Sequence, residues 1–149
     1  MAGKETRGVE GAEAELFVDR PYVLTSPDSE LEEWIRLVGA RLVRLSADEH
    51  DALVARSSHV PQLASTALAS LLQDEAAQVA GPGAVDMTRL ALSSYEIWKD
   101  ILATNPEAID HALAAYIAKL EEIRRDLRSP ATESHFERGA RGAERLRKR

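Results

Sequence analysis

The 149-residue sequence contains no cysteine, which excludes a disulfide framework, a thiolate metal site and a cysteine nucleophile. This composition fits a reducing compartment, and we expect a cytoplasmic protein. Its apolar runs are far shorter than the roughly 20 residues needed to span a bilayer. Residues 1–10 carry charge and glycine where a signal peptide needs an apolar stretch. We therefore expect neither a membrane partner nor export.

Several motifs of common enzyme classes are also missing. The sequence has no G-x-G-x-x-G or G-x-x-x-x-G-K-[ST] stretch, so it gives no sign of a dinucleotide or P-loop site. H-E-x-x-H and G-x-S-x-G are absent as well. The histidines are too scattered for their spacing to argue for a metal: His50, His59, His111 and His135. We expect this chain alone to bind no cofactor and no metal.

The sequence also has no excess of positive charge, since its net charge is −6. A negative net charge argues against nucleic acid as the main partner. The last twelve residues are nevertheless basic, with Glu144 as their single acid. They could form a basic arm for an anionic partner, or a solvated terminal helix whose cations suit a helix C-terminus. We favour the solvated helix, because terminal charge runs are usually solvated.

The composition that remains, 44% apolar and 30% charged, is that of an ordinary soluble globular domain. Residues 22–25 and 41–45 are predicted strands on either side of a helix. Ser26 and Pro27 are the predicted N-cap and first helical residue, and Gly39 is predicted to end this helix. A strand–helix–strand unit of this size cannot stand alone as a sheet. We expect its strands to need further partners, which the rest of the chain does not offer.

From Ser46 onward the pattern is helical throughout. Ser46 and Glu49 form a capping box, and apolar residues then recur at helical spacing as far as Leu72. Pro61 lies inside this pattern and is predicted to kink the helix, because proline lacks a backbone N–H donor. A break follows at residues 81–83. The sequence therefore predicts a mainly α protein with a small βαβ-like unit at its start.

Two further helix starts are predicted in the second half of the chain. Ser93 and Glu96 form a second potential capping box. Asn105 and Pro106 are the predicted N-cap and first residue of the last long helix. That helix has the most regular apolar seam, with alternating spacings of four and three residues: Ile109, Leu113, Tyr116, Leu120, Ile123 and Leu127. Such a seam predicts packing on another helix, either within the subunit or in a partner.

Three residues are candidates for chemistry. His59 directly precedes the predicted kink, where irregular backbone often accompanies a site, although on spacing alone we favour a helix histidine that forms a local hydrogen bond. Arg89 lies in an apolar neighbourhood, where it could bind a carboxylate or pair with Asp86 at helical spacing. The neighbours of Trp98 are apolar, which favours a position in the core over a role in binding a ligand. None of these signals alone names a function.

Taken in order, these segments resemble the prephenate and arogenate dehydrogenases of tyrosine biosynthesis. Residues 1–5 resemble the end of the family motif His-Pro-Met-Ala-Gly-x-Glu, and residues 16–25 resemble its following strand. The other matching segments are Glu49-His50-Asp51, Ser58-His59-Val60-Pro61, Asp86-Met87-Thr88-Arg89, Trp98-Lys99-Asp100-Ile101 and the helix start at Asn105. Each motif is weak alone, but their order and spacing together are specific.

This resemblance implies a fold and a reaction. The family binds NAD or NADP on an N-terminal Rossmann domain and dimerises through a helical C-terminal domain, with the substrate between them. The reaction is the oxidative decarboxylation of prephenate to 4-hydroxyphenylpyruvate, or the corresponding reaction of arogenate. We accordingly expect a homodimer that contacts a small-molecule substrate.

The resemblance also assigns residue roles. Arg89 falls on the arginine that holds the ring carboxylate, Glu5 on a polar residue of the site entrance, and Trp98 on a tryptophan near the pocket. His59 matches the first histidine of the Ser-His-x-Pro-His signature of many prephenate users. Gln62 replaces the second histidine, which contacts the substrate side chain. Glutamine can form hydrogen bonds but carries no charge, so arogenate stays open as the substrate.

The family's catalytic histidine would precede Met1, and the Rossmann domain would precede it as well. We therefore expect residues 1–46 to be the edge of a nucleotide-binding domain, 47–129 the helical dimerisation and substrate domain, and 130–149 a partly helical basic tail. The expected function is that of a truncated dehydrogenase, inactive alone. The alternatives are a standalone dimerisation or ligand-binding module, and an enzyme of related non-redox chemistry that uses His59 and Arg89.

Overall fold

The structure is a computed structural model that describes residues 9–148. It is mainly α-helical, with one small parallel sheet near its start, which confirms the predicted fold class. The chain divides into two compact units, with the boundary between Val54 and Ala55. Each unit is described by itself below.

The first unit is built around a strand–helix–strand segment. A short 3₁₀ turn, η1 (Val9–Gly11), precedes β1 (Pro21–Leu24), α1 (Ser29–Leu37), β2 (Arg41–Arg44) and α2 (Ala47–Val54). The two strands pair with each other in parallel, from Pro21 opposite Arg41 to Leu24 opposite Arg44. This pairing agrees with the predicted βαβ-like unit, and the expectation that its strands need further partners stays a prediction. The short crossover helix α1 brings β2 alongside β1.

Local signals fix both ends of α1. The helix ends as predicted at Gly39, whose φ of 73° is a left-handed conformation that favours glycine. The predicted start is wrong, because the N-cap is Asp28 rather than Ser26. The Asp28 carboxylate accepts the backbone N–H of Leu31 at 3.0 Å. Either residue can cap a helix, and the structure places Asp28 where its side chain reaches the first turn.

A carboxylate of α1 joins the helix to the sheet. Glu32 accepts two hydrogen bonds from the Arg44 guanidinium, at 2.9 Å from Nε and 2.6 Å from Nη2, and one from Arg36 at 3.1 Å. The Arg44 hydrogen bonds hold the pKa of Glu32 below its usual value. Ile35 of α1 and Leu24 of β1 are buried within the same unit. The ion pair between Glu32 and Arg44 links α1 to β2.

The predicted capping box at the start of α2 is confirmed. The Glu49 carboxylate accepts the backbone N–H of Ser46 at 2.8 Å, and the Ser46 hydroxyl accepts the backbone N–H of Glu49 at 3.2 Å. These reciprocal bonds satisfy two helix-end donors. The backbone N–H of Ser46 also lowers the pKa of Glu49.

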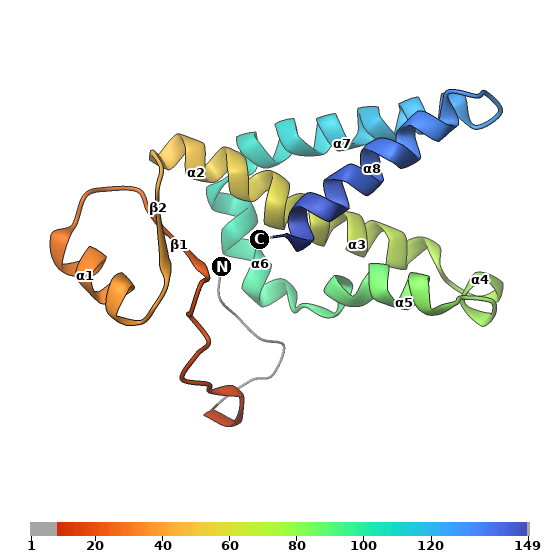
Figure 1. Ribbon diagram of the computed structural model, residues 1–149. Coiled ribbons are helices and arrows are strands. Elements are labelled where there is room, and N and C mark those ends of the chain that lie inside the picture. The colour runs from red at the N-terminus through yellow and green to blue at the C-terminus, as the bar shows by residue number, and fades with distance from the viewer. Residues whose placement is uncertain (1–8, 149) are drawn as a thin grey trace. The chain divides into compact units, whose positions relative to one another are not determined.

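The second unit is entirely helical. It begins with a π-helical turn, η2 (Ala55–His59), followed by α3 (Val60–Leu71), α4 (Glu75–Gln78), α5 (Pro82–Thr88) and the 3₁₀ turn η3 (Arg89–Leu92). Three further helices complete it: α6 (Tyr95–Thr104), α7 (Pro106–Asp126) and α8 (Thr132–Arg147). Figure 1 shows α7 and α8 joined by a tight turn into a helical hairpin. None of the described helices is both long enough and apolar enough to cross a bilayer.

Irregular backbone precedes Pro61, as the sequence predicted. Pro61 has no N–H to donate to the carbonyl of Ser57 one turn earlier, and Ser57 lies within the π-helical turn η2. Single π-turns of this kind are rare in helices and often occur at functional sites. The turn places His59 at its end, directly before α3.

Two of the predicted helix starts can be compared with the structure. Asn105 is the N-cap of α7 and Pro106 is its first residue, as predicted. The start of α6 differs by one residue, because its N-cap is Ser94 rather than Ser93. The Ser94 hydroxyl accepts the backbone N–H of Glu96 at 3.2 Å. Adjacent serines are equally good caps, and the sequence alone could not choose between them.

The core of the second unit lies where η2 and α3 meet α7. Its buried members are Ala55, Val60, Ile109 and Ala112, and Leu63, Leu102, Ala108, Leu113 and Tyr116 pack against them. The predicted seam of α7 therefore packs within the subunit at its N-terminal half. Towards its C-terminal end, Leu120 and Leu127 of the same seam are exposed.

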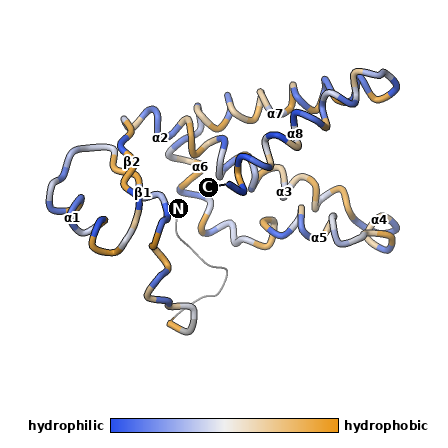
Figure 2. Tube along the Cα trace, viewed as in Figure 1, coloured by the Kyte–Doolittle hydropathy of each residue, from blue (hydrophilic) through white to orange (hydrophobic). Residues whose placement is uncertain are grey.

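The turn between α7 and α8 is held by polar contacts. His135 Nε2 lies 2.8 Å from an Asp126 carboxylate oxygen, and an Arg138 guanidinium nitrogen lies 2.9 Å from His135 Nδ1. The Thr132 hydroxyl donates to the backbone carbonyl of Asp126. The hydrogen bond from His135 lowers the pKa of Asp126. Figure 2 shows that α8 beyond this turn is mostly hydrophilic.

Candidate ligand pocket between α3, η3 and α6

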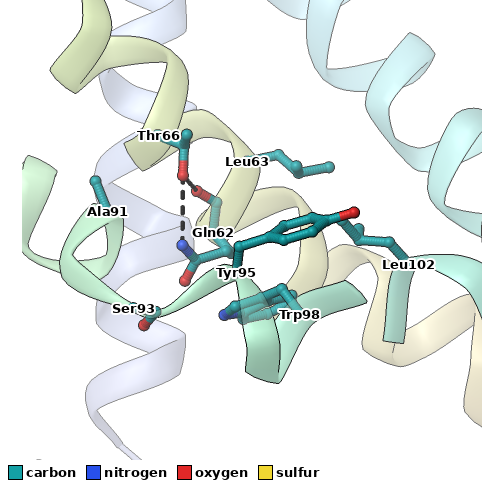
Figure 3. Close-up of a pocket in the computed structure, with 8 residues that line it drawn as sticks. All are labelled: Gln62, Leu63, Thr66, Ala91, Ser93, Tyr95, Trp98 and Leu102. Carbon is teal, nitrogen blue, oxygen red and sulfur yellow. Dashed lines mark hydrogen bonds between the residues drawn. The ribbon is translucent and has the colours of Figure 1, made fainter. Parts of the chain in front are cut away.

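A hollow of about 160 Å³ lies between α3, η3 and α6 (Figure 3). Most of its wall is apolar, and aromatic side chains of α6 form one side. Hydroxyl and amide groups of α3 and of the η3–α6 connection interrupt the apolar wall. The lining residues are Gln62, Leu63, Thr66, Ala91, Ser93, Tyr95, Trp98 and Leu102.

Gln62 is the most deeply buried polar residue of this wall, with 6% of its surface exposed. Its amide nitrogen donates to the backbone carbonyl of Leu90 at 2.8 Å and lies 3.3 Å from the Thr66 hydroxyl. The Thr66 hydroxyl in turn donates to the backbone carbonyl of Gln62 at 3.0 Å. Buried amides are costly unless bonded, so this arrangement fixes the side chain in one position.

A second buried hydrogen bond joins the same two elements. The backbone N–H of Ala91 donates to the Ser65 hydroxyl at 3.1 Å, and Ser65 is buried. With the bond from Gln62 to Leu90, it fastens η3 against α3 at two adjacent residues. We call this pair of hydrogen bonds the α3–η3 clasp. It sets the position of the residues on either side of it, including Arg89.

His59 and Trp98 form an aromatic pair beside the hollow. Their ring centroids are 5.9 Å apart and the rings meet at 89°, an edge-to-face arrangement. His59 is buried, whereas Trp98 is partly buried and also lines the hollow. The tryptophan therefore serves both as a packing residue and as part of the pocket wall, which the sequence had presented as alternatives.

The structure brings some of the predicted site residues together. His59, Gln62 and Trp98 gather at or beside the hollow. Arg89 is exposed at the first position of η3 and is not among the residues that line the hollow, although it adjoins the clasp. Glu5 lies outside the described residues.

Several pocket residues were missed in the sequence. Thr66 follows Gln62 by four residues, which places both on one helix face, and Tyr95 precedes Trp98 by three. These spacings could have pointed to both residues once Gln62 and Trp98 were chosen. Nothing local marked Ser93 as a pocket residue, or Ser65 as part of the α3–η3 clasp.

The hollow is suited to binding rather than to metal chemistry. Within residues 9–148, no group of three or more histidine, cysteine, aspartate or glutamate side chains is placed to hold a metal ion. The aromatic and aliphatic wall can cover an apolar ring, and the buried amide can fix the orientation of one polar group.

Comparison with known proteins decides the family. The family model "Prephenate dehydrogenase, dimerization domain" matches residues 46–139, which include η2, α3 to α7 and the hollow. The chain belongs to this family. The resemblance inferred from the sequence motifs is thereby confirmed.

Prephenate dehydrogenase of Lactococcus lactis is 33% identical over 93% of this chain and 42% of its own length. Cyclohexadienyl dehydrogenase of Zymomonas mobilis is 30% identical over 83% of this chain and 47% of its own length. The chain thus spans less than half the length of these two relatives.

Solved structures show the same fold. Arogenate dehydrogenase of Synechocystis matches 97% of this chain and 59% of its own chain, with a TM-score of 0.79 at 25% identity. Prephenate dehydrogenase of Aquifex aeolicus, in complex with hydroxyphenyl propionate and NAD+, matches 99% of this chain and 56% of its own chain, with a TM-score of 0.83 at 24% identity.

Proposed function

We propose that this chain supplies the helical, substrate-contacting part of a dehydrogenase that acts on prephenate or arogenate with NAD or NADP. The observation that carries the proposal is the hollow lined by Gln62 and Trp98, inside the segment that matches the family model. Two of the residues that the resemblance assigned to the substrate therefore line one hollow.

The size and wall of the hollow suit one end of such a substrate. Its volume of about 160 Å³ is below the roughly 300–1,000 Å³ typical of whole ligand pockets. A ligand would therefore enter with one part only and extend beyond the wall. In this proposal Trp98 covers an apolar face of the cyclohexadiene, and His59 positions the tryptophan by its edge-to-face contact.

Arg89 is the proposed partner of the ring carboxylate. A guanidinium binds a carboxylate through two parallel hydrogen bonds, a geometry that a point charge does not provide. Arg89 opens η3, and the next residue, Leu90, accepts the buried hydrogen bond from Gln62. The α3–η3 clasp thus holds the backbone beside Arg89 in place while the arginine remains exposed.

Calorimetric titration of prephenate, and separately of arogenate, into the purified chain tests this function. We expect binding of at least one ligand, and loss of that binding in an Arg89→Ala variant. Arg145→Ala is the matched control, because Arg145 is an exposed arginine on α8, outside the hollow. Binding that survives in Arg89→Ala would remove Arg89 from the proposal, and binding of neither ligand would refute the function.

We also propose a homodimer. The matched family model is a dimerization domain, and large apolar side chains stay exposed on α7 and α8: Ile117, Leu120, Phe136 and Leu146. An apolar hollow of about 420 Å³ lies on the same hairpin, lined by Ile123, Phe136 and neighbours on α8. Exposed apolar patches of this kind mark association surfaces. Light scattering at micromolar concentration should give twice the chain mass, and a monomer mass would contradict the proposal.

A further inference from the structure

We propose that Ser65 is a positioning residue for the binding of the ring carboxylate by Arg89. The inference rests on the proposed function, because it concerns the arginine proposed there to hold that carboxylate. Ser65 is not among the residues that line the hollow. It acts through the backbone of η3, which it holds against α3 together with Gln62.

The two hydrogen bonds of the α3–η3 clasp hold a single peptide unit. The Gln62 amide donates to the carbonyl of Leu90 at 2.8 Å. The N–H of Ala91 donates to the Ser65 hydroxyl at 3.1 Å. This carbonyl and this N–H belong to the same peptide group, which is planar and rigid. One hydrogen bond would leave the unit free to swing, whereas two bonds at its opposite ends fix its direction.

The spacing of the two side chains on α3 suits this arrangement. Gln62 and Ser65 are three residues apart, so they lie on the same helix face, about 4.5 Å apart along the helix axis. A trans peptide unit presents its carbonyl and its N–H in opposite directions. The unit between Leu90 and Ala91 can therefore reach both side chains at once, with its carbonyl towards Gln62 and its N–H towards Ser65.

Arg89 lies immediately before the peptide unit that the clasp holds. It is the C-cap of α5 and the first residue of η3, and only one peptide unit separates its α-carbon from the held one. The Leu90 carbonyl also accepts the N–H of Ser93 at 3.0 Å, which closes the turn of η3. The clasp therefore limits where the backbone can carry the guanidinium group. Paired hydrogen bonds to a carboxylate need that group in one direction, so a displaced backbone weakens them.

The burial of Ser65 supports a role for its hydroxyl outside α3. Only 3% of the residue is exposed. Alanine forms helices more readily than serine, and burying a hydroxyl is costly unless it is hydrogen-bonded. The bond to Ala91 therefore accounts for a serine at this position. That bond could serve stability alone or also the position of Arg89, and the two roles predict different binding data.

The test compares ligands that differ in the ring carboxylate. The proposed reaction removes this carboxylate, so prephenate carries it and the product 4-hydroxyphenylpyruvate does not. Arogenate and its decarboxylated product form a second pair of the same kind. Calorimetric titration of both members of a pair into the purified chain gives the ratio of their affinities. In Ser65→Ala we expect the substrate to bind about tenfold more weakly, the scale of one hydrogen bond to a charged group, and the product to bind as in wild type.

Ser70→Ala is the matched control, because Ser70 is an exposed serine of the same helix whose hydroxyl donates to the carbonyl of Ala67 within α3. We expect it to leave the ratio of affinities unchanged. Equal weakening of substrate and product in Ser65→Ala, or no weakening of either, would overturn the inference. Both results leave the proposed function standing if Arg89→Ala still loses the substrate. Binding of no ligand by the wild-type chain would overturn the inference together with the proposed function.

A measurement on the wild-type chain decides the matter if Ser65→Ala does not fold. Hydrogen exchange followed by NMR reports whether the Ala91 N–H is held in a hydrogen bond. We expect this amide to exchange on the order of a hundredfold or more slowly than in an unstructured peptide, because its bond to Ser65 must open first. Exchange at the rate of an unstructured peptide would show that Ser65 does not hold η3, and it would overturn the inference.

Discussion

Replacing Ile109 by alanine should destabilise the second unit by about 3–4 kcal/mol, within the range of about 2–5 kcal/mol found for such core truncations. Ile109 is only 6% exposed and lies in the cluster that joins η2 to α7. Alanine removes three carbon atoms, and at about 0.8 kcal/mol for each buried carbon the lost transfer free energy is about 2.4 kcal/mol. The cavity left behind supplies the remainder, because the neighbouring Ala55 and Ala112 are too small to fill it.

Ile117→Ala is the matched control for this prediction. Ile117 lies on the same helix, and 49% of its surface is exposed. Both substitutions change the intrinsic helix propensity equally, so the difference between the two variants reports burial alone. Urea unfolding followed by circular dichroism should give a loss of about 1 kcal/mol or less for Ile117→Ala, since exposed positions contribute little.

Equal losses of stability in the two variants would refute the assignment of the core to the N-terminal half of α7. The measurement is made at two protein concentrations, because unfolding of a dimer depends on concentration whereas unfolding of a monomer does not. A loss in Ile117→Ala that changes with concentration would place this residue in the proposed dimer interface. The larger loss in Ile109→Ala should be the same at both concentrations.

Two further predictions concern polar contacts. Ser46→Ala removes the capping box of α2 and should lower the free energy of unfolding by about 1 kcal/mol. The control Ser70→Ala, at an exposed serine inside α3, should lower it less. Equal losses in the two variants would show that the capping box does not stabilise the protein. The Asp126–His135 contact lowers the pKa of Asp126. The stabilising effect of this contact is therefore complete above the ordinary pKa of a carboxyl group, and it is lost as the pH falls through the lowered pKa of Asp126. The difference in unfolding free energy between wild type and Asp126→Asn should therefore shrink as the pH falls from about 4 to about 2. A difference that stays constant over this interval would exclude the ion pair as its source.

The parts of the fold that were predicted correctly depend on neighbouring residues. The capping box of Ser46 and Glu49, the helix stop at Gly39 and the helix start at Asn105 and Pro106 all form within one turn of chain. Local backbone geometry decides such features, so short sequence patterns are sufficient to find them. Where two capping residues stand close together, as Ser26 and Asp28 do, the pattern could not choose between them.

The sequence by itself determined the helical character of the second unit, the irregular turn before Pro61 and the family, because these depend on periodicity, on a missing N–H and on ordered motifs. Only the tertiary structure decided that β1 and β2 pair with each other and that η3 fastens onto α3. It also decided the direction of the Gln62 amide, because the carbonyl that fixes its nitrogen belongs to Leu90, 28 residues further along the chain. No local pattern encodes a contact over that separation, since it exists only after α3 and η3 have packed together.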